Sequence, residues 1–278
     1  MEIKYLITFV IGTRPEAIKL APVIKFFKES LKFKIRVLLS GQHSEMVSQV
    51  MHLFNIQHDK NLNLMKRNQS INYITQEVLE GMRSEYIENR PELVFVQGDT
   101  TTAFAASLAA FYEKIPVAHV EAGLRTGKLL DPYPEEANRR LISQIATLHF
   151  APTEMARDNL ACSGIMENVF VTGNTIIDAL KMVSEKVNPF EMEGVDLNNK
   201  KLILATVHRR ENWGSNLNNI AFALKKIVET DSSSLLLIPL HKNPKVRNPL
   251  KKILEGHKRI ILTDPLEYHK LISVMKAC

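Results

Sequence analysis

The stretch Leu6-Ile-Thr-Phe-Val-Ile11, followed directly by Gly12-Thr-Arg-Pro-Glu-Ala17, decides the fold class of this chain. The first six residues are rich in apolar and β-branched side chains, which is typical of a strand buried on both faces. The glycine allows the backbone to turn sharply, and the proline suits the first turn of a helix. The stretch therefore predicts a strand, a tight turn and a helix, the unit from which parallel α/β sheets are built.

The same alternation continues through the first half of the chain. Strand-like runs recur at residues 35–39, 93–96, 117–120, 148–150 and 169–171. Most of the segments between them have helical length and polar helix starts, such as Ser70 and Thr100 to Thr102. This pattern predicts one doubly wound sheet of parallel strands.

A second series of elements follows a polar stretch. Residues 181–200 are rich in polar side chains and turn signals, and strand-like runs then recur at 202–206, 235–238 and 260–262. Helices are expected near residues 217–229, 245–255 and 266–276. We therefore expect an N-terminal Rossmann-like domain over 1–178, a linker over 179–200 and a C-terminal Rossmann-like domain over 201–278. The last has room for only about three βα units, so we expect its sheet to be incomplete.

Composition excludes several classes of protein. The chain has 278 residues, of which 45% are hydrophobic and 24% charged, as in a soluble globular protein. Its longest nearly apolar stretch, Ala103 to Tyr112, is about half the length that a membrane-spanning helix needs. The N-terminus does not resemble a signal peptide, so we expect a cytoplasmic location and no membrane partner. The two cysteines are not spaced for a disulfide framework or a zinc site, and no metal is expected.

The formal net charge of +6 makes an anionic partner plausible. The basic residues are scattered through helical stretches, and no basic motif rich in aromatic residues of the kind that binds single strands is present. We therefore expect a small phosphorylated substrate and no nucleic acid.

The first candidate site is an anion site at the start of the first helix. Ligands of open α/β sheets bind beyond the carboxyl ends of the strands, and Arg14 and Lys19 follow the first strand there. The outward-pointing amides of a helix N-terminus would add to their positive charge. The alternative is an ordinary turn with solvated charges. The glycine spacing does not match a nicotinamide fingerprint.

The second candidate site is a group of carboxylates. Asp99 and Glu121 follow two other strands, and the segment Pro134 to Arg139 opens a helix with Glu135 near its start. Carboxylates gathered in a cleft raise one another's pKa, so that one can act as a base and another as an acid. Acid/base chemistry on a weakly acidic C–H bond is a natural use. Alternatively, Asp99 only caps the helix that follows it.

Two basic loops follow strands of the second half. His208 and Arg209 follow its first strand, and His241 follows its second. Histidine and arginine side chains of this kind can bind phosphate. No arrangement of histidines typical of a metal site is present.

Six motifs in series resemble the bacterial non-hydrolysing UDP-N-acetylglucosamine 2-epimerases. They are Gly12-Thr-Arg-Pro-Glu-Ala-Ile-Lys19, Gly98-Asp-Thr-Thr-Thr102, His119-Val-Glu-Ala-Gly-Leu-Arg-Thr126, Pro134-Glu-Glu-Ala-Asn-Arg139, Thr172-Gly-Asn-Thr175 and His208-Arg-Arg-Glu-Asn212. The resemblance covers essentially the whole chain, in order. It implies a glycosyltransferase-B-like pair of Rossmann domains, a homodimer, and interconversion of UDP-GlcNAc with UDP-ManNAc for cell-surface polysaccharide synthesis, without metal or nicotinamide.

The resemblance also implies a mechanism. A base removes the C2 proton while UDP leaves C1, which gives 2-acetamidoglucal, and UDP then adds back with the opposite configuration at C2. By position, the acid/base carboxylates are Asp99, Glu121 and Glu135. The resemblance implies that the negative charge on the leaving diphosphate is stabilised by Arg14, Lys19 and His208. It implies further substrate-binding residues, which are Arg139, Asn174 and Arg209. Gln42, Arg67 and His241 resemble a second, allosteric UDP-GlcNAc site.

The family pattern continues beyond Cys278 with elements that hold the UDP ribose and diphosphate. We therefore expect weak catalysis from these residues alone. Two alternatives to an active epimerase remain. One is a catalytically silent protein that binds a nucleotide sugar, and the other is a related glycosyltransferase. A hydrolysing relative that releases free ManNAc remains as a third.

Overall fold

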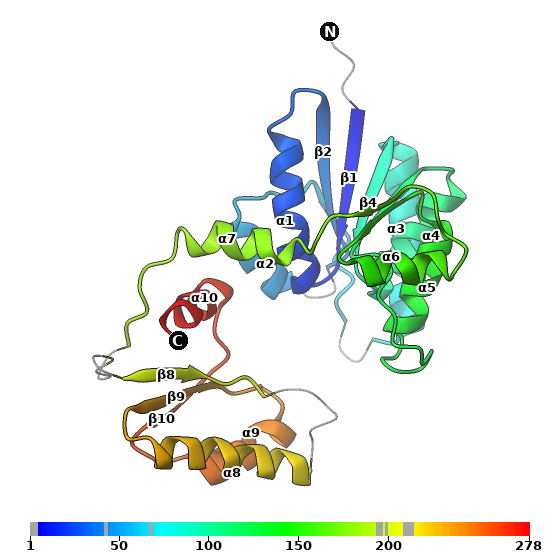
Figure 1. Cartoon of the computed structure of the whole chain (residues 1–278). Helices are drawn as coiled ribbons and strands as arrows, with labels where there is room; N and C mark the ends of the chain where they lie inside the picture. Colours follow the sequence, from blue (N-terminus) through cyan, green and yellow to red (C-terminus); the bar gives the residue numbers. More distant parts are fainter. Residues whose placement is uncertain (1–4, 42–43, 67–68, 193–196, 198–199, 208–213) are drawn as a thin grey trace. The chain divides into compact units, whose positions relative to one another are not determined.

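The computed structural model describes residues 5–41, 44–66, 69–192, 197, 200–207 and 214–278. The chain divides into two compact units, Met1–Ala179 and Leu180–Cys278. Each unit has its own parallel sheet and its own helices (Figure 1).

The first unit is built on a seven-stranded sheet whose order is β3-β2-β1-β4-β5-β6-β7, with every neighbouring pair parallel. The strands are β1 (Tyr5–Ile11), β2 (Phe33–Leu39), β3 (Lys60–Asn61), β4 (Leu93–Gln97), β5 (Val117–Val120), β6 (Leu148–Ala151) and β7 (Val169–Val171). All six strands predicted from the apolar runs are confirmed. The short β3 was not predicted, because its two polar residues carry no hydrophobic pattern and form a strand only by pairing with Leu38 and Leu39.

A helix follows each of these strands, and the last helix crosses from the first unit into the second. These helices are α1 (Arg14–Lys28), α2 (Ser44–Leu53), α3 (Ile71–Glu88), α4 (Thr101–Tyr112), α5 (Glu135–Ile145), α6 (Glu154–Ala161) and α7 (Ile176–Ser184). Two predicted helix starts are confirmed, because the Ser70 hydroxyl accepts from the Tyr73 amide at 3.1 Å and the Thr100 hydroxyl from the Ala103 amide at 3.0 Å. Each hydroxyl satisfies an amide that has no partner within its helix.

Both faces of the large sheet are covered. On one face, Val94 and Val96 of β4 belong to a buried cluster that includes Val78 of α3 and Ala106 of α4. On the other face, the Phe95 ring stacks on Phe9 at 4.8 Å and meets Phe27 of α1 edge-on at 5.4 Å. Successive side chains of a strand point to opposite faces, which explains why these strands are continuous apolar runs.

The second unit repeats the plan on a smaller scale. Its sheet has the order β10-β9-β8, and all pairs are parallel. Its elements are β8 (Lys201–Leu204), α8 (Ser215–Thr230), β9 (Ser234–Pro239), α9 (Pro244–Leu254), β10 (Ile260–Thr263) and α10 (Tyr268–Ala277). Helices α8 and α9 cover the face of Leu236 and Ile238, and α10 covers the face of Leu235 and Leu237 (Figure 1). The predicted strands and helices of this half are confirmed.

The strand order of the first unit fixes where a ligand can bind. From β1 the chain steps outward to β2 and β3, and it then returns to place β4 on the other side of β1. The connections after β1 and β4 therefore leave the sheet in opposite directions, and such a switch point forms a crevice at the carboxyl ends of the strands. The turns that begin at Gly12 and Gly98 both lie at this edge.

Candidate active site

The turn after β1 brings the starts of two helices into contact. A Cβ atom on Gly12 would lie 2.4 Å from the Thr102 hydroxyl in α4, so only glycine permits this approach. Glu16, which is 1% exposed, accepts hydrogen bonds from the amides of Gly12 at 3.0 Å and Thr13 at 2.5 Å, and from the Thr100 hydroxyl at 2.8 Å. Burial raises the pKa of Glu16 to about 7, and these hydrogen bonds oppose the rise.

This arrangement corrects part of the predicted anion site. The amides of Gly12 and Thr13 were expected to point outward toward a phosphate, but they donate to Glu16 within the protein. A carboxylate of the chain itself therefore occupies the position where the helix N-terminus attracts negative charge. What remains for an anion is Arg14, which is partly exposed and has no hydrogen bond or salt bridge within the described part of the chain.

Asp99 does not cap the helix that follows it. Thr100 takes that role, and the Asp99 carboxylate instead accepts from Arg139 Nη2 at 2.5 Å. Burial raises the pKa of Asp99, the Arg139 guanidinium lowers it, and the nearby Glu135 and Glu121 raise it, with a net rise above the ordinary value. The alternative that Asp99 only caps the following helix is therefore wrong, and its side chain belongs to a charged cluster.

Glu121 follows β5 directly and lies in the left-handed region of backbone conformation, with φ 66°. Its Oε1 accepts from Asn174 Nδ2 at 2.9 Å. Its Oε2 accepts from Lys19 Nζ at 2.5 Å and also from Gln97 Nε2. A left-handed conformation is uncommon for a residue with a side chain, and such strained positions concentrate at functional sites.

The ends of β4 and β5 are tied together beneath these carboxylates. The Gly98 amide donates to the Val120 carbonyl at 3.0 Å, and His119 Nε2 donates to the Gly98 carbonyl at 2.7 Å. His119 is completely buried, and burial lowers its pKa to about 4, which keeps the ring neutral. Two hydrogen bonds to β5, the strand that directly precedes Glu121, therefore hold the turn that contains Asp99 in place.

Helix α5 supplies two consecutive glutamates with different surroundings. Glu135 is partly exposed and has no hydrogen bond or salt bridge to another residue that the structure describes, although its charge acts on Asp99. Glu136 is completely buried, and its carboxylate forms salt bridges with Arg139 at 3.4 Å and Arg140 at 2.8 Å. Burial opposes the charge on Glu136, but hydrogen bonds from Arg140 and the Thr126 amide outweigh it and lower its pKa.

The structure gathers a subset of the predicted site residues in the first unit. Lys19 and Asn174 meet at Glu121, Arg139 meets Asp99, and Glu135 acts on Asp99 through its charge. His241 lies in the second unit, where its Nδ1 accepts from the Asn243 amide at 3.1 Å. Gln42, Arg67, His208 and Arg209 fall outside the described residues.

Sequence reasoning missed Gln97, His119 and Glu136 as parts of this cluster. Gln97 and His119 lie at the ends of apolar strands, where polar side chains are expected to reach the crevice, and that position was the available signal. Glu136 gave no signal that separated it from Glu135.

Other features do not define a competing site. No group of three side chains suited to a metal ion occurs among the residues whose placement is described. None of the helices in that part of the chain is long and apolar enough to cross a bilayer.

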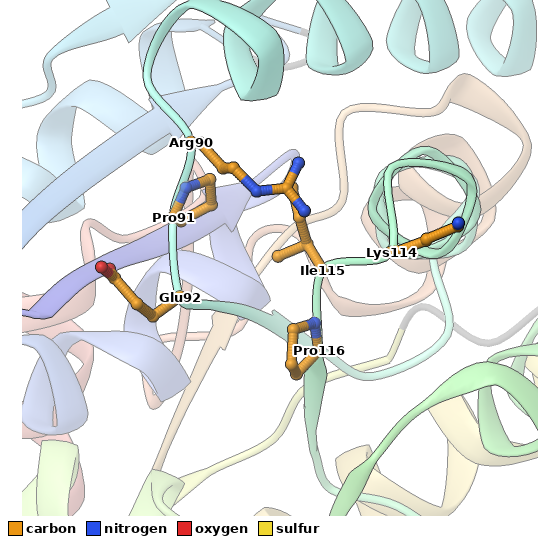
Figure 2. A pocket seen from close by; sticks show the side chains of 6 residues that line it. All are labelled: Arg90, Pro91, Glu92, Lys114, Ile115 and Pro116. Carbon is orange, nitrogen blue, oxygen red and sulfur yellow. The ribbon is translucent and has the colours of Figure 1, made fainter.

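A separate pocket lies at the opposite edge of the large sheet. Figure 2 shows its lining, which is Arg90, Pro91, Glu92, Lys114, Ile115 and Pro116. These residues precede β4 and β5, whereas Asp99 and Glu121 follow them. Glu92 accepts from the Leu6 amide at 2.5 Å, and Arg90 donates to the Glu113 carbonyl at 2.9 Å, so two of the pocket's three charged side chains are used within the protein.

These observations define a class of protein, a two-unit α/β enzyme with carboxylates gathered at the switch point of its larger sheet. The sequence profile of the family described as UDP-N-acetylglucosamine 2-epimerase matches residues 25–278. The chain therefore belongs to the UDP-N-acetylglucosamine 2-epimerase family, whose enzymes are isomerases.

Individual relatives of known sequence and structure support this family assignment. The UDP-N-acetylglucosamine 2-epimerase of Yersinia pestis is 45% identical over 96% of this chain and 73% of its own length. That of Escherichia coli K12 is 44% identical over 96% of this chain and 73% of its own. The crystal structure of the Neisseria meningitidis enzyme bound to UDP-GlcNAc has a TM-score of 0.88 and 43% identity, and covers 98% of this chain and 76% of that one.

The glycosyltransferase-B-like architecture is supported by a more distant structure. A lipopolysaccharide outer core galactosyltransferase matches with a TM-score of 0.52 at 13% identity and covers 94% of this chain. At that identity the likeness concerns the fold alone.

Proposed function

We propose that this chain interconverts UDP-GlcNAc and UDP-ManNAc by inverting the configuration at C2 of the sugar. Membership of the epimerase family supports this reaction. The observation that carries it is the convergence of Asp99 and Glu121 from neighbouring strand ends, one paired with Arg139 and the other surrounded by three donors. Two carboxylates in unlike surroundings suit a reaction in which a proton is removed and later returned.

In the proposed reaction, a base removes the C2 proton and the C1–O bond to UDP breaks. The electron pair of the C2–H bond forms the C1–C2 double bond of 2-acetamidoglucal, and UDP leaves with the electron pair of its bond to C1. Re-addition of UDP at C1 with proton delivery to the other face of C2 gives the epimer. We assign the proton transfers to Asp99, Glu121 and Glu135.

Positive charge must stabilise the leaving diphosphate, and electrostatic stabilisation of this kind is often the largest contribution to catalysis. We propose Arg14, Lys19 and His208 for this role, with Arg139, Asn174 and Arg209 as further contacts of the site. Arg14 has the strongest structural support, because it is partly exposed at the start of α1 and its guanidinium is free among the described residues. Lys19 already pairs with Glu121, so we propose that it also orients that carboxylate.

The remaining proposals rest on the family resemblance. They are a homodimer, a cytoplasmic location, a role of the product in polysaccharide synthesis, and a second UDP-GlcNAc site that includes Gln42, Arg67 and His241.

The decisive experiment is incubation with UDP-GlcNAc in deuterated water, followed by NMR. We expect deuterium at C2 and formation of UDP-ManNAc, both lost in Glu121→Gln. The matched control is Glu80→Gln, at a side chain that is 69% exposed, and it should keep full activity. Arg157→Met, at an exposed arginine that pairs with Glu154 and Asp158, is the control for arginine substitutions.

Other outcomes would identify the alternatives. Free ManNAc would indicate a hydrolysing enzyme, and UDP release only after addition of an acceptor would indicate a glycosyltransferase. Binding of UDP-GlcNAc by a folded protein without exchange at C2 would reject the proposed activity for this chain.

A further inference from the structure

Gln97 is a buried amide that the reaction, as described so far, does not use. It ends β4, its side chain is 2% exposed, and its Nε2 donates to Glu121 Oε2. An amide is neutral at every pH in the working range, so Gln97 adds a hydrogen-bond donor to this carboxylate without adding charge.

The backbone holds the two side chains together. Gln97 is paired with Val120 in the parallel ladder, and Glu121 is the next residue after Val120. The Gly98 amide and carbonyl are both bonded to β5, by way of Val120 and His119. The separation of Gln97 and Glu121 is therefore set by the sheet, and not by a flexible loop.

The two oxygens of Glu121 differ in their partners. Oε2 accepts from both Lys19 and Gln97, whereas Oε1 accepts, among the residues that the structure describes, only from Asn174. A carboxylate oxygen offers about two acceptor positions, so Oε2 is filled, and Oε1 retains a position that no residue of the described ranges occupies.

We infer that Gln97 is a positioning residue for Glu121. Together with Lys19 it occupies Oε2, fixes the plane of the carboxylate and leaves Oε1 as the atom that exchanges a proton with the substrate. This inference rests on the proposed function, because it concerns the same carboxylate. Gln97 itself does not touch the reacting atoms.

Two substitutions separate positioning from packing. Gln97→Met keeps the length and volume of the side chain but removes the donor. Gln97→His changes the shape but restores an N–H group. If only packing matters, Met is tolerated and His is not, whereas a positioning role predicts the reverse order of activity.

The test measures kcat and KM for UDP-GlcNAc, exchange at C2 and the melting temperature of each variant. For Gln97→Met we expect kcat to fall about tenfold to hundredfold, the effect of losing one hydrogen bond to a charged group, with KM within about twofold of wild type. We expect Gln97→His to recover most of this loss. Gln144→Met is the matched control, because the Gln144 side chain is exposed and makes one hydrogen bond within the described ranges, to the Ser163 carbonyl at 3.4 Å.

Each result decides the inference. Wild-type kcat in Gln97→Met, or a loss in Gln97→His as large as in Gln97→Met, would overturn it. If Gln97→Met does not fold, wild-type-like kcat in Gln97→His supports the inference, and a large loss in folded Gln97→His rejects it. Failure of the proposed function looks different, because the wild-type protein would then show no exchange, or Glu121→Gln would exchange as fast as wild type.

Discussion

Glu16 makes stability depend on pH. Its pKa is raised from 4.5 to about 7 because the side chain is buried, so the folded protein holds a proton that the unfolded chain releases. The free energy of unfolding should therefore fall as the pH rises from 4.5 through 7, by at most about 3 kcal/mol. Glu16→Gln should flatten this part of the stability curve, as measured by urea unfolding from about pH 4 to about pH 8.

The control for Glu16→Gln is Glu80→Gln, because the Glu80 side chain is 69% exposed. That substitution should leave the slope of the curve unchanged. Parallel curves for wild type and Glu16→Gln would contradict the role assigned to Glu16.

We expect Asp99, as a proposed acid/base residue, to make activity depend on pH, and we expect Arg139 to set the pKa of its carboxyl group. Burial raises the pKa of Asp99, and the guanidinium of Arg139 is the main influence that lowers it. Arg139→Met removes that influence, so the pKa of Asp99 should rise further. The limb of the pH–rate profile that Asp99 governs should move to higher pH, whichever protonation state is the active one. The reference is the pH–rate profile of Arg157→Met. If the limb lies at the same pH in Arg139→Met as in this reference, Asp99 does not control that limb.

At the scale of single elements, α5 separates two neighbouring glutamates by helical geometry. Residues one apart on a helix point in different directions, so Glu135 reaches the site while Glu136 is buried against Arg139 and Arg140. Glu135→Gln should change the free energy of unfolding by no more than about 0.5 kcal/mol and lower C2 exchange about 100-fold or more. Glu136→Gln breaks a buried ion-pair network and should cost about 3 to 5 kcal/mol. Chemical denaturation and the exchange assay distinguish the two, and equal stability losses would refute the division.

Most elements were predictable because their evidence is local. The runs that became β1, β4 and β5 are apolar and short, and each is followed by a turn residue or a helix start. The two-residue β3 was not predictable from local sequence, because it forms a strand only by pairing with β2.

The site was predictable only in part. Asp99 and Glu121 follow strands, which local sequence reveals, but their partners come from distant positions. Lys19 is 102 residues from Glu121, and Arg139 is 40 residues from Asp99. The hydrogen bonds from the Gly12 and Thr13 amides to Glu16 were also missed, although Thr13-Arg-Pro-Glu16 has the spacing of a capping box and was therefore a readable signal.

At the scale of the whole molecule, each unit has a separate core. Leu20 in α1 is 0% exposed and Leu236 in β9 is 1% exposed, and they belong to different units. Because each unit has its own sheet and its own buried cluster, we expect two transitions in scanning calorimetry of the intact chain. Leu20→Ala should lower the midpoint of one transition and Leu236→Ala that of the other, each by the equivalent of about 2 to 5 kcal/mol. A single transition that both substitutions shift equally would show instead that the two units unfold as one cooperative body.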